Sequence, residues 1–271
     1  MDLSTVTEVR REPSVPAWRA GDAWLAGGTW LFSEPQPHLT RLIDLTAFGW
    51  PALTVRDDGL EIAATCTIAE LAGFGYPSSW LGAALFRPCC DAFLASFKIW
   101  NVATVGGNLC TALPAGPMIA LTVALDGVCT VWGVGGTERT VAAADLVTGP
   151  GETALEPGDL LRSVHLPAEA LHSSVAFRQA SLRPLGRSAA LVIGRQAPGG
   201  LVVTVTASTV RPVVLELPAR PDASQLEAAV HEAIPPELYH DDVHGDPDWR
   251  QHLTLTLAEE IRVELAARIP R

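Results

Sequence analysis

The chain has 271 residues, of which 48% are apolar and 18% charged, and its 23 Gly and 21 Pro are spread along it. This composition excludes a disordered chain, and the length suits one large domain or two modest ones. Thirty acidic against 19 basic residues give a net charge of -11, a field that repels nucleic acid and acidic membrane surfaces.

The first half of the chain predicts short strands, turns and two buried helices. A strand that starts at residue 23 runs into the glycine pair of "AWLAGGTWLF", and Asp57 to Gly59 form the turn of a hairpin. Thr67 and Glu70 match a capping box at the start of a helix. The other expected elements are a strand at 40–48, a helix at 82–96, a strand that leads into the second glycine pair, and a helix at 114–125.

The second half predicts antiparallel strands followed by helices. A hairpin turns at Gly135 and Gly136, and a strand covers "LLRSVHLP" at 160–167. The pattern restarts near residue 170, which indicates a second module. Its expected elements are a strand near 175–180, two strands on either side of residues 198–200, and helices at 222–233 and 248–268.

Targeting segments and metal sites are not predicted. The N-terminal "MDLSTVTEVRREPSVP" lacks an apolar core and contains acidic residues, so we expect a cytoplasmic protein. The most apolar window, 118–136, is interrupted by Asp126 and Gly127, which argues against a membrane span. The five cysteines lack the spacing of an iron–sulfur loop, and we interpret residues 240–244 as a solvated loop rather than a metal site.

Two glycine pairs carry the functional hypothesis. "LAGGTWL" at 25–31 and "TVGGNLCT" at 104–111 both place Gly-Gly before a small polar side chain. If the two loops lie side by side, their backbone N–H groups can surround the two phosphates of a dinucleotide. Neither loop fits G-x-G-x-x-G, so a Rossmann site is not supported.

At these residues the chain resembles the FAD-binding subunits of the molybdenum hydroxylases, such as the medium subunit of carbon monoxide dehydrogenase. Members typically show AGGTDL, then I-G-A-x-x-T, then R-N-x-A-T-[IV]-G-G-N-L-x-x-A-S-P-x-x-D. Here the corresponding stretches are "AGGTWL", "IAATCTIAEL" and "WNVATVGGNLCTALPAGP". Three later stretches, "LEPGDLLRSVHLP", "VAFRQASLRPLGRSAA" and "DVHGDPDWRQHL", are similar to family elements in the same order.

The resemblance implies an α+β fold with a vanillyl-alcohol-oxidase-like (PCMH-type) FAD-binding domain of two small α/β subdomains, followed by a C-terminal α+β domain. We place the FAD-binding domain at 1–168, with subdomains at about 1–50 and 51–168, and the C-terminal domain at 169–271. It also implies FAD as the cofactor. The implied cofactor-binding residues are Ala26, Gly27, Gly28, Thr29, Trp30, Thr104, Gly106, Gly107, Asn108, Thr111, Leu160, Leu161 and Arg178.

Within that set, backbone N–H groups of the two loops are expected to hold the diphosphate, with hydrogen bonds from Thr29, Asn108 and Thr111. Leu160 and Leu161 are expected to line the cofactor. Arg178 lies where many relatives carry a Lys near the flavin ring, and a cation there would favour the anionic reduced flavin.

Three positions depart from the family pattern, and all concern the cofactor. Trp30 replaces a small polar or acidic residue, Leu113 replaces Ser, and Pro117 replaces an Asp that typically contacts FAD hydroxyls. A lost carboxylate-to-hydroxyl hydrogen bond costs about 1.5 to 3 kcal/mol of binding. For Trp30 three alternatives stay open: it stacks on an aromatic ring, fills the gap, or blocks the site.

The function implied by the resemblance is that of an oxidoreductase subunit of the xanthine, CO or aldehyde dehydrogenase type. Electrons from a molybdenum-cofactor large subunit would cross iron–sulfur clusters on a small subunit, reach FAD here, and pass to NAD or another acceptor. The expected assembly is a heterotrimer or a dimer of heterotrimers. Two alternatives stay open: a stand-alone FAD-dependent oxidoreductase acting on a small molecule, and a fold relative that has lost FAD. No catalytic acid or base is assigned.

Overall fold

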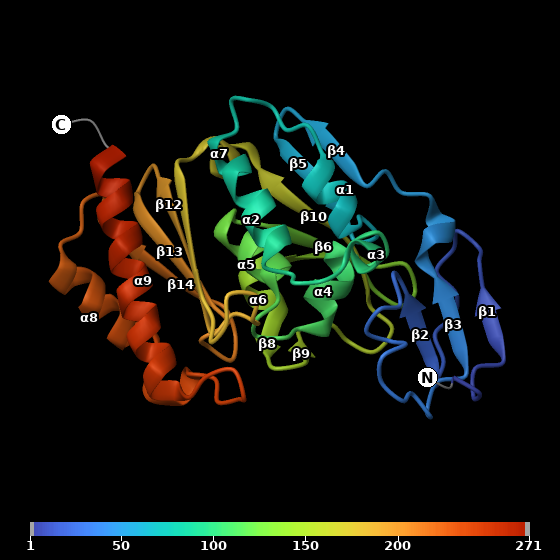
Figure 1. Ribbon diagram of the computed structural model, residues 1–271. Coiled ribbons are helices and arrows are strands. Elements are labelled where there is room, and N and C mark those ends of the chain that lie inside the picture. The colour runs from blue at the N-terminus through green and yellow to red at the C-terminus, as the bar shows by residue number, and fades with distance from the viewer. Residues whose placement is uncertain (1–2, 269–271) are drawn as a thin grey trace.

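The computed structural model describes residues 3–268, and within them four β-sheets are arranged along the length of the molecule (Figure 1). The N-terminal sheet has three parallel strands in the order β1-β3-β2. These are β1 (Glu8–Arg10), β2 (Asp22–Leu25) and β3 (Arg41–Asp44), and a 3-10 turn η1 (Leu45–Phe48) follows. Figure 1 shows this small sheet at one end, drawn in blue.

A buried ion pair joins two strands of the N-terminal sheet. The Asp22 carboxylate on β2 is fully buried and accepts hydrogen bonds from Arg41 Nε (2.7 Å) on β3 and from the Arg19 backbone N–H (2.9 Å). Burial alone would raise the pKa of Asp22, but the hydrogen bonds and the two positive charges outweigh burial and lower this pKa below its ordinary value of 3.8.

We expect the Asp22→Asn variant to have a lower free energy of unfolding than wild type, mainly at neutral pH. A lowered pKa in the folded state means that the ionised carboxylate stabilises the fold above pH 3.8, and that this contribution is lost as the pH falls through the folded-state pKa. The difference in unfolding free energy between wild type and variant should therefore shrink between about pH 7 and about pH 3, as urea titrations can measure. Asp91→Asn, which removes an exposed partner of Arg87, is the matched control. A difference for Asp22→Asn that is the same at both pH values would contradict this.

The central sheet has five antiparallel strands in the order β4-β5-β10-β6-β7. Its strands are β4 (Leu53–Arg56), β5 (Gly59–Ala63), β6 (Val128–Trp132), β7 (Glu138–Ala142) and β10 (Leu160–Pro167). The helices between them are α1 (Ile68–Gly73), η2 (Leu81–Leu85), α2 (Phe86–Asp91), α3 (Phe97–Trp100), α4 (Val105–Thr111), α5 (Pro117–Ala124) and α6 (Ala143–Leu146). A two-stranded ladder of β8 (Val147–Gly149) and β9 (Glu152–Thr153) and the short α7 (Ala168–His172) complete this part.

The C-terminal sheet is an antiparallel meander of four strands in chain order. The strands are β11 (Val175–Ala180), β12 (Ala190–Ala197), β13 (Gly200–Thr206) and β14 (Val213–Leu217), and the helices are α8 (Ala223–Ala233), η3 (Pro236–Leu238) and α9 (Pro247–Arg268). In Figure 1, α8 and α9 lie on one side of this sheet and α5 on the other. All eight residues of α5 are buried, because the helix packs between this sheet and the rest of the core.

Several sequence predictions are confirmed by this fold. The hairpin that turns at residues 57–58 forms between β4 and β5, and the capping box between Thr67 and Glu70 is present. The hairpins β6-β7 and β12-β13 and the two C-terminal helices are also present. The proposed boundary between 168 and 169 stays a prediction, although the chain changes sheets between β10 and β11.

Two predictions were wrong. The helix expected at 82–96 is a 3-10 turn followed by α2, which ends at Asp91; the chain then turns at Leu94, whose φ is +50°. No strand leads into the second glycine pair: the short helix α3 precedes it, and "VGGNLCT" itself forms the helix α4, with Thr104 as its N-cap. Within residues 3–268, no helix combines the length and the apolar character needed to cross a bilayer.

Candidate functional site

A cavity of about 750 Å³ lies where the loop after β2, the region around α4 and the loop after β11 meet. Its volume is in the range of small-molecule and cofactor sites. It collects most of the residues predicted for the cofactor from segments far apart in the sequence. The predicted residues that line it are Ala26, Gly27, Gly28, Thr29, Trp30, Thr104, Gly107, Asn108 and Thr111.

The first glycine loop is pressed directly against the segment that precedes α4. A Cβ atom added to Gly27 would lie 1.7 Å from the Val102 carbonyl oxygen, so no side chain fits there. Gly28 has a φ of +70°, and a Cβ at this position would lie 2.5 Å from the ring of Phe32. Both glycines are therefore required by the close approach of the two loops and by the backbone conformation.

The backbone N–H groups of this first loop are free to bind an anion. None of the N–H groups of residues 27–31 donates a hydrogen bond to another group in the described part of the chain. Residues 27–31 all line the cavity, and backbone N–H groups without a protein partner at such a surface can donate hydrogen bonds to anionic oxygen atoms.

The sequence prediction that the second glycine pair offers free backbone N–H groups was wrong. Its N–H groups are already used: Gly106 donates to the Ala64 carbonyl oxygen (3.0 Å), Gly107 to Thr104 Oγ1 (3.0 Å) and Asn108 to the Thr104 carbonyl oxygen (3.0 Å). A Cβ on Gly106 would lie 2.5 Å from Ala64 Cβ. This pair therefore allows close packing of α4 against the chain after β5 instead of supplying free amides.

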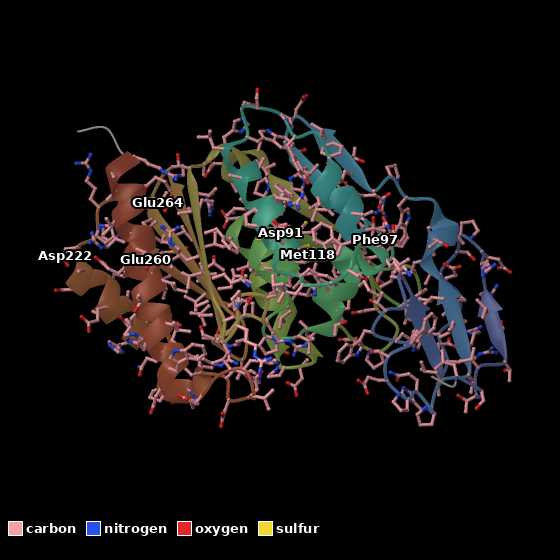
Figure 2. All side chains as sticks on the ribbon, in the orientation of Figure 1. Asp91, Phe97, Met118, Asp222, Glu260 and Glu264 are labelled. Atoms are coloured by element: carbon pink, nitrogen blue, oxygen red, sulfur yellow. The ribbon has the colours of Figure 1, made fainter. Side chains whose placement is uncertain are left out.

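The polar side chains on α4 keep hydrogen-bonding capacity toward the cavity. Asn108 Oδ1 accepts a hydrogen bond from the Met118 backbone N–H at the start of α5 (3.0 Å), which leaves the side-chain NH2 group as a donor. Thr111 Oγ1 donates to the Gly107 carbonyl oxygen (2.7 Å), which leaves its lone pairs to accept. Figure 2 shows Met118 near the centre of the molecule.

Four predicted residues do not line this cavity. Gly106 packs against Ala64, and Leu160 and Leu161 are buried on β10. The guanidinium of Arg178 pairs with Glu260 and Glu264 of α9 at 2.7 Å each, on the face of the C-terminal sheet that α9 covers (Figure 2). The position of Arg178 thus does not support the expected role beside the cofactor, since both acidic partners hold its charge on the other side of the sheet.

The three altered positions, Trp30, Leu113 and Pro117, all line the cavity. Trp30 is 46% exposed, and a cavity of about 750 Å³ remains beside its side chain. Pro117 is the first residue of α5, where a missing N–H costs nothing. The structure therefore gives Pro117 a helix-starting role in place of the absent carboxylate.

Sequence reasoning missed the contribution of the loop between β11 and β12. Leu185 and Arg187 from this loop line the cavity, and so do Phe93 and Leu94 after α2. Among the lining residues in the described part of the chain, Arg187 carries the only charged side chain. No local pattern distinguishes Arg187 from the other arginines of "RQASLRPLGR".

Comparison with known proteins identifies relatives of this chain. Residues 15–169 match the model of the FAD binding domain in molybdopterin dehydrogenase. The chain is 32% identical over 121 residues to a xanthine dehydrogenase of Oryza sativa subsp. japonica, covering 42% of this chain and 9% of that enzyme. It is 29% identical over 169 residues to the carbon monoxide dehydrogenase medium chain of Afipia carboxidovorans, covering 61% of this chain and 57% of that one.

The fold has close structural counterparts. A chain of the reconstituted CO dehydrogenase from Oligotropha carboxidovorans superposes with a TM-score of 0.79 and 22% identity, and the match covers 97% of both chains. At this level of identity the similarity shows the fold alone. This chain spans 9% of the length of the xanthine dehydrogenase and 57% of the length of the carbon monoxide dehydrogenase medium chain.

Proposed function

Since this chain belongs to the family of FAD-binding domains in molybdopterin dehydrogenases, we propose that it is the electron-transfer flavin subunit of a multi-subunit molybdenum hydroxylase. The observation that carries the proposal is the cavity beside the first glycine loop, where residues 27–31 present backbone N–H groups without a partner in the described part of the chain. A cofactor with a diphosphate needs donors of this kind.

The residues of the cavity fit FAD in volume and in chemistry. We infer that the N–H groups of Gly27, Gly28 and Thr29 hold the diphosphate, because these residues line the cavity and their N–H groups have no acceptor in the described part of the chain. The side chains of Asn108 and Thr111 would bind hydroxyl groups of the ribityl or ribose parts, one as donor and the other as acceptor.

The charge of the lining also suits an anionic cofactor. No aspartate or glutamate side chain belongs to the lining residues, although the chain as a whole carries a net charge of -11. The phosphates would therefore meet backbone dipoles and one arginine rather than acidic groups. FAD, when bound, supplies the capacity to accept and release electrons one or two at a time.

The finer points of the proposal follow from the resemblance and from the relatives. We infer a vanillyl-alcohol-oxidase-like FAD domain at 1–168 and a C-terminal domain at 169–271. The subunit would accept electrons from an iron–sulfur small subunit, which is itself reduced by a molybdenum-cofactor large subunit, and deliver them to NAD or another acceptor. The similarity to a carbon monoxide dehydrogenase medium chain supports such an assembly.

Reconstitution with FAD is expected to give a stable, stoichiometric complex. After gel filtration the protein should retain both flavin absorption bands, and FAD should bind more tightly than riboflavin, because riboflavin lacks the diphosphate that the free amides would hold. Equal affinity for FAD and riboflavin would contradict the proposed role of residues 27–31. If neither compound binds, the chain is a fold relative that has lost FAD, and the proposed function is wrong.

Electron transfer between subunits can be tested separately. The chain should co-purify with an iron–sulfur subunit and a molybdenum subunit from the same organism when all three are expressed together. In the absence of oxygen, substrate of the large subunit should bleach the flavin bands only when the iron–sulfur subunit is present. If the isolated chain instead oxidises a small molecule by itself, the stand-alone alternative is correct.

A further inference from the structure

Arg187 has an unusual position among the arginines of this chain. It lies in the loop between β11 and β12, it lines the cavity, and its guanidinium has neither a hydrogen bond nor an ion pair within residues 3–268. Arg41, Arg178, Arg195 and Arg250, by contrast, each pair with a carboxylate. In an acidic protein, an unpaired cation at an otherwise uncharged cavity is available to a ligand.

The backbone that carries Arg187 is firmly held on its C-terminal side. Ser188 is buried, and its hydroxyl oxygen accepts a hydrogen bond from Gln179 Nε2 (2.8 Å). The Ala189 N–H donates to the Ala180 carbonyl oxygen (2.8 Å), and the Ala189 carbonyl accepts from Arg250 Nη1 (2.7 Å). Arg187 is thus the last residue of the loop before a fixed anchor, which limits where its side chain can reach.

The same anchor also connects to a second segment that lines the cavity, at residues 113–115. Arg250 Nη1 also donates to the Ala207 carbonyl oxygen (2.5 Å), and the Ala207 N–H donates to the Pro114 carbonyl oxygen (2.9 Å). Pro114 lies between Leu113 and Ala115, which both line the cavity. Through these hydrogen bonds the buried Arg250 connects the end of the Arg187 loop with the segment just before α5.

We propose that Arg187 is the charge partner of the negatively charged oxygen atoms of bound FAD, carried on a backbone that Arg250 anchors two residues later. This inference rests on the proposed flavin function. The anionic oxygens are on the diphosphate in every redox state and on the flavin ring only after reduction, and two measurements separate these sources. The inference gives Arg187 the charged role that the family resemblance implied for Arg178.

The test compares Arg187→Gln with Arg187→Lys and with a matched control, Arg183→Gln. Arg183 belongs to the same exposed loop and has no side-chain partner within residues 3–268, but it does not line the cavity. The dissociation constant of oxidised FAD is measured by titration at low and high salt, and the midpoint potential of the bound flavin by anaerobic reduction. Circular dichroism melting shows whether each variant is folded.

We expect Arg187→Gln to weaken the binding of oxidised FAD about ten-fold at low salt, with a smaller loss at high salt, if the diphosphate is the partner. If the reduced ring is the partner, the affinity for oxidised FAD is kept and the midpoint potential falls. Arg187→Lys keeps the positive charge, so it should retain most of the wild-type FAD affinity and midpoint potential. Arg183→Gln should behave as wild type.

The inference is overturned if Arg187→Gln changes neither quantity, or if Arg183→Gln changes them equally, since a general effect of loop charge would then explain the data. Wild-type protein that binds no FAD would overturn this inference and the proposed function together. Wild-type protein that binds FAD, with an unaffected Arg187→Gln variant, would overturn the inference alone.

Discussion

Replacing Gly27 by alanine is expected to destabilise the protein by about 3 kcal/mol and to abolish the retention of FAD. The added methyl group would lie 1.7 Å from the Val102 carbonyl oxygen and 2.6 Å from its carbon atom. Both atoms belong to the backbone, so no side-chain rotation can relieve the overlap. The loop must move away from residues 102–103, and the N–H groups of residues 27–31 move with it.

Urea unfolding and FAD titration measure the two parts of this effect. Gly75→Ala is the matched control, because Gly75 is exposed and a Cβ there would meet no atom within 4 Å. We expect the control to stay within about 0.5 kcal/mol of wild type and to bind FAD normally. A Gly27→Ala variant with the stability and FAD affinity of the control would show that the two loops do not pack as described.

Replacing Arg250 by methionine is expected to cost about 3 kcal/mol of stability, because it removes a buried guanidinium that pairs with Asp242 and satisfies backbone carbonyl groups. Arg250 is only 1% exposed, and its guanidinium pairs with Asp242 and donates to the carbonyl oxygens of Gly245 (2.9 Å), Ala189 and Ala207. Methionine fills a similar volume but leaves the carboxylate and the three carbonyl groups without this donor.

Thermal and urea unfolding of Arg250→Met test this prediction against Arg87→Met. Arg87 forms an exposed ion pair with Asp91 on α2, and its removal should leave the melting temperature nearly unchanged. Arg250→Lys should recover only part of the loss, since an ammonium group cannot reproduce the planar set of donors. If Arg250→Met is as stable as Arg87→Met, the guanidinium does not hold the two segments together.

Features that depend on neighbouring residues could be predicted from the sequence. The capping box at Thr67 needs only a Glu three positions later, and the hairpin turns need glycine, aspartate or proline between two apolar stretches. The family motifs at the two glycine pairs are equally local, and they led to the FAD-binding family before any contact between the loops was known.

The end of the helix after Leu81 could not be predicted in this way. Apolar residues at Leu85, Cys89, Phe93 and Phe97 follow a helical spacing, which predicts a helix through residue 96. In the fold, Phe93 and Leu94 line the cavity, and the backbone leaves the helix after Asp91 to bring them there. A tertiary requirement overrides the local periodicity at this point.

The availability of donors and charges was decided by tertiary structure alone. Both glycine pairs look alike along the chain, yet of these two loops only the first, residues 27–31, keeps N–H groups without a partner within residues 3–268. The second pair lies in α4, and its N–H groups donate to residues 64 and 104. Arg178 and Arg187 are nine positions apart, and the sheet directs one toward the glutamates of α9 and the other toward the cavity. The sequence shows which hydrogen-bond donors and charged side chains are present. The packing of distant segments determines which of them find a partner in the protein and which remain available to a ligand.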